Sequence, residues 1–73
     1  MSEIIASFLI CRKNGEKIAE LVCEHIGTGT YLHYIKYNGH NANHVISLEE
    51  YERILKEARE RGYDVFDYSP VED

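Results

Sequence analysis

The chain is poor in the residues that mark several common classes of protein. It has no tryptophan, one proline, one methionine and two cysteines among its 73 residues. Two cysteines are too few for a small secreted scaffold held together by several disulfides. The low proline content and the apolar fraction of 44% argue against disorder. No apolar run approaches the roughly 20 residues of a membrane-spanning helix, so we expect one small globular domain over residues 1–73.

Basic residues are also scarce. Residues 1–48 carry four acids and four bases, whereas residues 49–73 carry nine acids and four bases, which accounts for the whole net charge of −5. Direct nucleic-acid binding depends on clustered Lys and Arg, so we do not expect it. Residues 4–11 are apolar but have neither a basic leader nor a small-residue cleavage site. We therefore expect a cytoplasmic protein with reduced thiols.

The clearest predicted element is a helix over residues 48–61. Ser47 and Glu50 have the spacing of a capping box, and Ile46 and Tyr51 have that of a hydrophobic staple. Apolar residues recur every three or four positions, and Gly62 is typical of the position after a helix. Opposite charges four residues apart predict three ion pairs on the exposed face, namely Glu49–Arg53, Glu52–Lys56 and Glu57–Arg61.

Residues 3–46 are expected to form an antiparallel sheet. The alternating residues 3–11 are followed by Asn14-Gly15, which predicts a two-residue type I′ turn. That turn would place Ile4 opposite His25. It would also place Cys11 and Cys23 on opposite faces, which predicts two free thiols.

Turns at residues 27–29 and 38–39 then separate predicted strands at 31–37 and 42–46. Residues 63–68 are expected to add an edge strand, and residues 69–73 to form a frayed tail. The fold class is α+β: a four- to five-stranded antiparallel meander with one helix on one face, in the order ββββα(β).

The sheet face that the helix leaves uncovered would carry Ile5, Leu9, Ile18 and Val22. Apolar patches of this kind often mark association. A homodimer or another bound partner would cover this face. An ordinary half-apolar outer face, which is common in small sheets, explains the same pattern equally well.

Four histidines and two cysteines suggest a metal site. A two-residue turn at Asn38-Gly39 would place His33 directly opposite His44, close enough to share one cation. A three-residue loop at 27–29, with Gly29 left-handed, would add Cys23 and His25 and give a cluster that zinc accepts.

A two-residue turn at 27–29 would instead turn His33 to the open face beside Glu24. Two histidines and one carboxylate would then form the candidate site. Histidines and tyrosines on an ordinary half-exposed strand are a third interpretation, which needs no metal. We find no catalytic signature and expect a protein that is not an enzyme.

The acidic C-terminal third suggests a protein-binding surface. Carboxylates in a line can imitate a row of phosphates and occupy a basic groove on another protein. A solubilising terminus is the simpler interpretation of any one of these acids. The candidate partner-binding residues are Glu57, Glu60, Tyr63, Asp64 and Asp67.

In size, acidity and element order the chain resembles small phage-encoded inhibitor proteins of the anti-CRISPR type. The resemblance includes no signature motif, so no binding residue can be carried over. It implies a stoichiometric inhibitor of a CRISPR effector or another nucleic-acid enzyme, acting in the cytoplasm of a bacterial host. The alternatives are a zinc-stabilised domain built on the histidine and cysteine cluster, and an antitoxin-like regulatory subunit.

Overall fold

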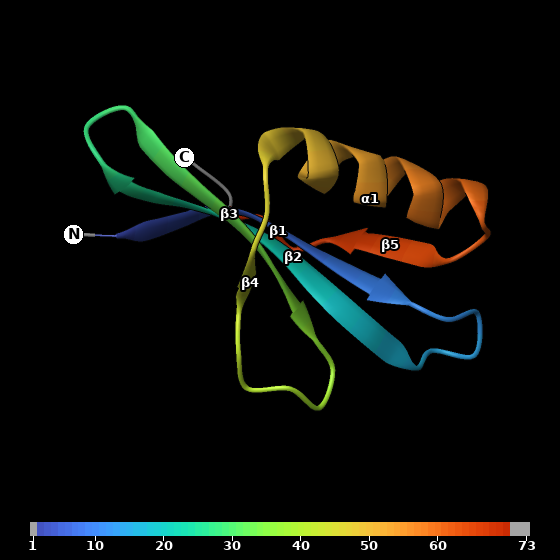
Figure 1. Cartoon of the computed structure of the whole chain (residues 1–73). Helices are drawn as coiled ribbons and strands as arrows, with labels where there is room; N and C mark the ends of the chain where they lie inside the picture. The colour runs from blue at the N-terminus through green and yellow to red at the C-terminus, as the bar shows by residue number, and fades with distance from the viewer. Residues whose placement is uncertain (1, 71–73) are drawn as a thin grey trace.

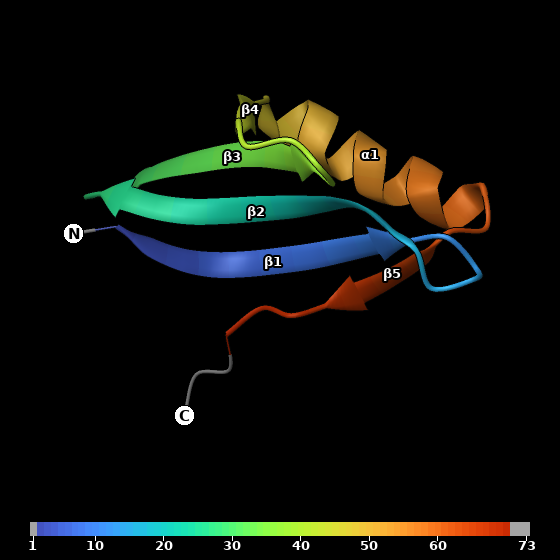
Figure 2. The same cartoon turned by 90° about the horizontal axis from the view of Figure 1, so that it is seen from below.

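A computed structural model describes residues 2–70, which form a five-stranded antiparallel sheet with one helix against one face (Figures 1 and 2). The elements are β1 (Glu3–Cys11), β2 (Lys17–Gly27), β3 (Thr30–Tyr37), β4 (His44–Val45), α1 (Leu48–Glu60) and β5 (Asp64–Asp67). The strand order is β4-β3-β2-β1-β5. The predicted α+β fold and element order are therefore confirmed. The fifth strand lies beside β1, so that α1 crosses the sheet from one edge to the other.

Both ends of α1 are fixed by local bonds. The amide of Glu50 donates to the hydroxyl oxygen of Ser47 at 3.1 Å, which is one half of the predicted capping box. At the other end the amide of Gly62 donates to the carbonyl of Arg59, and that of Tyr63 to the carbonyl of Ala58. This pair of bonds is a Schellman motif. It requires the left-handed conformation that Gly62 adopts, with φ at 85°.

The first hairpin differs from its prediction in the turn. The amide of Gly15 donates to the carbonyl of Arg12, and Gly15 has φ at 91°, whereas Asn14 does not have a positive φ. A type I′ turn at Asn14-Gly15, which needs positive φ at both residues, is therefore wrong. The observed turn shifts the pairing of the two strands by one residue relative to the prediction. A β-bulge whose extra residue is Ile18 then restores the predicted pairing.

The predicted central pairs of this hairpin are confirmed as a result. They are Ala6 with Cys23, Phe8 with Leu21, and Ile10 with Ala19. A second bulge at Ile5 changes the far end of the hairpin. There Ile4 lies opposite Glu24, not opposite His25 as expected, and His25 pairs with Glu3.

The second hairpin follows the first of the two registers considered. Cys23 pairs with His33, and Gly29 is left-handed with φ at 68°. A direct Gly27–Thr30 pair and a bulge at Ile26 together produce this register. The alternative, with His33 on the open face beside Glu24, is therefore wrong.

The core lies between α1 and the sheet. Its buried residues come from every layer and are Ile10, Ala19, Leu21, Cys23, Ile35, Tyr51 and Ala58. Ile46 packs against this cluster, as the predicted staple requires. Both cysteines are free and buried, which confirms the two predicted thiols.

The open face is less apolar than expected. Val22 is only 3% exposed, and hydrogen bonds join polar neighbours around it: Tyr34 donates to Glu24 at 3.1 Å, and Ser7 donates to Glu20 at 3.3 Å. Ile18 packs against the core instead, because the bulge changes its direction. The predicted apolar patch on this face is therefore smaller than the sequence suggested.

The segment after β5 is held to β1 up to Ser69. The amide of Tyr68 donates to the carbonyl of Ser7, and the amide of Ser7 donates to the hydroxyl oxygen of Ser69 at 3.1 Å. The prediction of a frayed tail over residues 69–73 is therefore wrong for Ser69. Residues 71–73 of that predicted tail lie outside the described residues. Within residues 2–70, no helix is long and apolar enough to cross a membrane.

Candidate functional site

Two of the four predicted metal ligands are in contact. The Sγ atom of Cys23 lies 3.4 Å from Nε2 of His33, and the tautomer of the imidazole decides which of the two donates. The pairing follows directly from the β2–β3 register. Burial raises the pKa of the Cys23 thiol, so the thiol stays protonated near neutral pH. A thiol in this state is a poor nucleophile.

His44 does not join this pair. It lies opposite Ile35, and the residue opposite His33 is Ile46, whose amide donates to the His33 carbonyl at 3.0 Å. The prediction of His33 opposite His44 is therefore wrong by two residues. The turn at Asn38-Gly39 does form, but the strand resumes only at His44, so the connection is longer than a two-residue hairpin turn.

The other two histidines of the prediction contact tyrosines. The ring of His25 lies 5.1 Å from that of Tyr31, and the ring of His44 lies 5.7 Å from that of Tyr37, measured between centroids. Among residues 2–70, no three His, Cys, Asp or Glu side chains are grouped so as to hold a metal ion. Zinc binding stays a prediction, now centred on Cys23 and His33. Native mass spectrometry before and after EDTA treatment tests it.

Tyr51 covers the Cys23–His33 pair from the helix side. Its ring packs edge-on against that of His33, with centroids 5.1 Å apart. The side chain is 6% exposed, and its hydroxyl is buried without a hydrogen-bond partner in the described chain. Burial, with a smaller contribution from Cys23, raises the pKa of Tyr51 to about 12. The sequence assigned Tyr51 only to the staple and did not indicate its contact with His33 or the burial of its hydroxyl.

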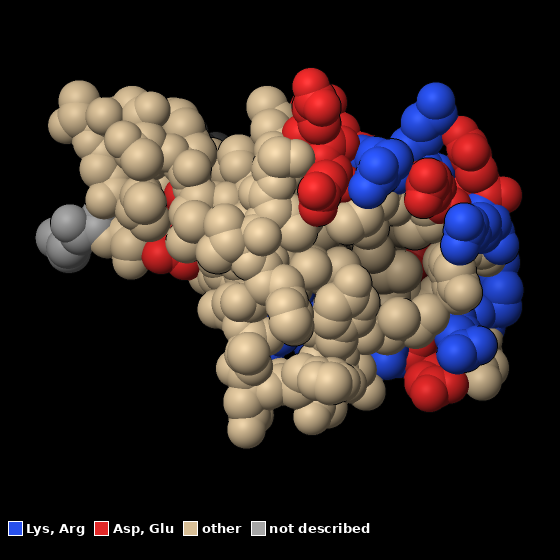
Figure 3. Space-filling view, in the orientation of Figure 1, with Lys and Arg blue, Asp and Glu red and all other residues tan. Residues whose placement is uncertain are grey.

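Three of the acidic partner-binding candidates have partners within the chain. Asp64 is bonded to Lys13 at 2.8 Å, and Glu60 lies 3.9 Å from Lys56. Hydrogen bonds from the side chain and from the backbone amide of Ser69 lower the pKa of the Asp67 carboxyl group. Figure 3 shows the acids of this end of the molecule interspersed with Lys and Arg. The geometry therefore gives little support to imitation of a row of phosphates.

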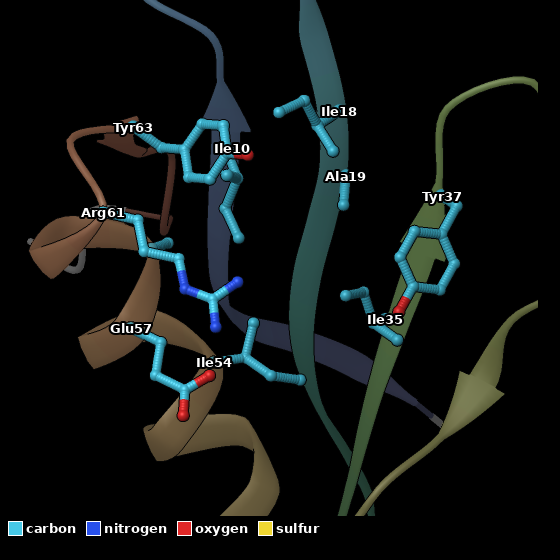
Figure 4. A pocket seen from close by; sticks show the side chains of 10 residues that line it. Ile10, Ile18, Ala19, Ile35, Tyr37, Ile54, Glu57, Arg61 and Tyr63 are labelled. Atoms are coloured by element: carbon cyan, nitrogen blue, oxygen red, sulfur yellow. The ribbon is translucent and has the colours of Figure 1, made fainter.

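Glu57 and Tyr63, the other two candidates, lie at a cavity that the sequence did not reveal. The cavity has a volume of about 250 Å³ and lies between the C-terminal half of α1 and the sheet (Figure 4). Buried apolar residues form its floor, and Arg61 and Tyr37 are also part of its lining. The spacing of Glu57 and Arg61 predicted an ion pair on the exposed face of the helix, so the sequence did not indicate that both residues line a cavity.

A second unexpected feature is the end of the sheet that extends beyond α1. We call residues 3–5 and 24–32 the projecting arm (Figure 1). Four large apolar side chains on it are 40–52% exposed: Ile4, Ile5, Ile26 and Tyr31. The chain has no Lys or Arg between Lys17 and Lys36, and Figure 3 shows no basic atoms on the arm.

The chain matches no protein-family model, no curated protein and no solved structure.

Proposed function

We propose that this protein is a protein-binding module that acts without catalysis and docks through its projecting arm. The observation that carries the proposal is the coincidence of exposed apolar side chains with a free strand edge. Within residues 2–70, β5 pairs with β1 from Phe8 to Cys11, and the bonds of Tyr68 and Ser69 extend this contact to Ser7. Among the described residues, no strand pairs with residues 3–6 of β1 on that side.

Free edges of this kind are usually protected. Natural sheets block them with Lys, Pro or a covering loop, because an open edge pairs with another chain. Here the edge carries Ile4 and Ile5, which are 44% and 40% exposed, beside Glu3, and the arm has no Lys or Arg. An extended segment of a partner that adds to this edge would gain backbone hydrogen bonds and apolar contacts together.

Substitution of the edge tests the proposal. We expect Ile4→Lys and Ile5→Lys to abolish partner binding, because a charge would be buried against the added strand. Thermal stability should change little, since both side chains are already well exposed. The matched control is Phe66→Lys on β5, where the side chain is 46% exposed but lies outside the arm.

The partner is found by photo-crosslinking in the cells that make the protein. A photoreactive residue at position 4 should crosslink one partner, and the same residue at position 66 should not. Ile5→Lys should remove that crosslink. A crosslink between two copies, with a dimer mass that Ile5→Lys abolishes, would identify the partner as a second copy of the chain. Equal crosslinking from positions 4 and 66 would contradict the proposal.

The specific form that we propose is a stoichiometric inhibitor of a nucleic-acid-processing complex. Its support is the resemblance in size, acidity and element order to anti-CRISPR proteins. Titration into the cleavage reaction of a purified CRISPR effector tests it. Inhibition should be complete at a molar ratio near one and should be lost with Ile5→Lys.

A further inference from the structure

The cavity beneath α1 combines an apolar floor with one unpaired cation. Ile10, Ala19, Ile35 and Ala58 form the floor and are each at most 7% exposed. An open cavity lined in this way leaves apolar surface in contact with water, and an apolar group that fills it is stabilised by burial of that surface.

Arg61 supplies the charge. Four ion pairs are present among residues 2–70, and Arg61 belongs to none of them, because the expected Glu57–Arg61 pair does not form. Figure 4 shows the guanidinium group between the helix and the sheet, beside Ile10 and Ile54, with the carboxylate of Glu57 near it in this view. A guanidinium group beside an apolar cavity can bind a carboxylate through two parallel hydrogen bonds.

We propose that this cavity binds a small monocarboxylate with a compact apolar body, either one aromatic ring or a short branched chain. The body lies on the floor and the carboxylate pairs with Arg61. The volume of about 250 Å³ is below the roughly 300–1,000 Å³ of pockets for drug-sized ligands, which limits the body to this size. Glu57 on the same lining disfavours phosphates and dicarboxylates, whose second charge it would repel.

Titration with phenylacetate, followed by ¹⁵N–¹H NMR, tests the proposal. We expect shifts that saturate at the amides of Ile10, Ile35, Ala58 and Arg61. Phenylacetamide has the same shape but no charge. Its affinity should be at least about tenfold lower than that of phenylacetate, because the charge-assisted bonds are lost. Phenyl phosphate should also bind more weakly than phenylacetate.

The variant Arg61→Gln should weaken phenylacetate binding by about tenfold or more. The matched control is Arg59→Gln, since Arg59 is in the last turn of the same helix but does not line the cavity. Unchanged binding in Arg61→Gln, or the absence of saturating shifts at the cavity, would overturn the proposal. Ile5→Lys on the projecting arm should leave phenylacetate binding intact, so this site and the proposed docking function can fail separately.

Discussion

The ring and the hydroxyl of Tyr51 have opposite effects on the stability of the fold. Its ring packs against His33 and Phe8, with centroids 5.1 and 6.4 Å away, whereas its hydroxyl has no hydrogen-bond partner within residues 2–70. A buried hydroxyl without a partner costs about 1–3 kcal/mol. The apolar contacts of the ring therefore stabilise the fold, and the hydroxyl offsets part of that gain.

We predict that Tyr51→Phe is neutral or stabilising by up to about 2 kcal/mol at pH 8, because it removes the hydroxyl and keeps the ring. The difference should grow at high pH. Burial raises the pKa of Tyr51 from 10.0 to about 12. Ionisation of Tyr51 therefore favours the unfolded chain, so the free energy of unfolding of the parent protein is unaffected by it below pH 10 and falls as the pH rises toward 12. Urea unfolding at pH 8 and pH 11 measures both effects.

Phenylalanine at position 51 does not titrate, so the variant should lose less stability between these pH values than the parent protein. Two pKa units correspond to about 3 kcal/mol as an upper limit at complete ionisation. Tyr68→Phe is the control, because Tyr68 is 63% exposed. A loss of more than about 1 kcal/mol in Tyr51→Phe at pH 8 would show that the hydroxyl is bonded, with Cys23, which contributes to the raised pKa of Tyr51, as a candidate partner.

At the scale of the elements, sequence predicted the helix better than the strand pairing. The helix ends depend on local signals, namely the hydroxyl of Ser47 and the glycine at position 62, and both act as expected. Strand register depends instead on bulges, and those at Ile5, Ile18 and Ile26 have no local signature. A turn motif such as Asn14-Gly15 does not report the bulges in the strands that flank it.

The same distinction explains the candidate sites. Cys23 and His33 were placed together correctly although the expected three-residue loop does not form, because the bulge at Ile26 adds the residue that the two-residue turn lacks. His44 was misplaced because the connection after Gly39 is longer than its turn motif suggests. The cavity was missed because Glu57 and Arg61 have the spacing of a helical ion pair, and sequence does not show that Arg61 turns toward the sheet instead.

We predict that Gly62→Ala destabilises the protein by about 1 kcal/mol. A Cβ atom at this position would meet nothing within 4 Å, so the cost is the left-handed backbone conformation alone. Gly27→Ala is a matched control, because its Cβ atom would also meet nothing within 4 Å and its backbone is not left-handed. The free energies of unfolding in urea measure the difference, and equal losses in both variants would contradict the conformational explanation.

At the scale of the whole molecule, the Lys and Arg residues lie away from the projecting arm and its exposed apolar side chains. The molecule extends 39 Å along its longest axis and 23 Å along its shortest. Lys and Arg lie toward the helix end in Figure 3, whereas the projecting arm carries Ile4, Ile5 and Ile26. The charged residues at the helix end favour solubility, and the arm, whose only Asp or Glu residues are Glu3 and Glu24, remains available for association.

We predict that local stability differs along β2, between the part that α1 covers and the part that belongs to the projecting arm. β2 has partners on both sides throughout, since Leu21 pairs with Phe8 and Ile35, and Glu24 pairs with Ile4 and Leu32. Leu21 is 0% exposed, whereas Glu24 and its neighbours on the arm have no helix above them. Local opening is easier where few apolar contacts are lost, so the amides of Glu24 and His25 should exchange at least about tenfold faster than those of Leu21 and Val22.

Hydrogen exchange followed by NMR measures this difference within one strand, which removes strand pairing as a variable. Uniform protection from Leu21 to His25 would mean that the arm is as rigid as the core, and that contacts other than those of α1 hold it. Faster exchange on the arm would fit the proposed docking, because an edge that opens at small cost can adjust its register to an added strand. Addition of the partner should then slow exchange at Glu24 and His25 and leave Leu21 unchanged, since Leu21 is already protected by the core.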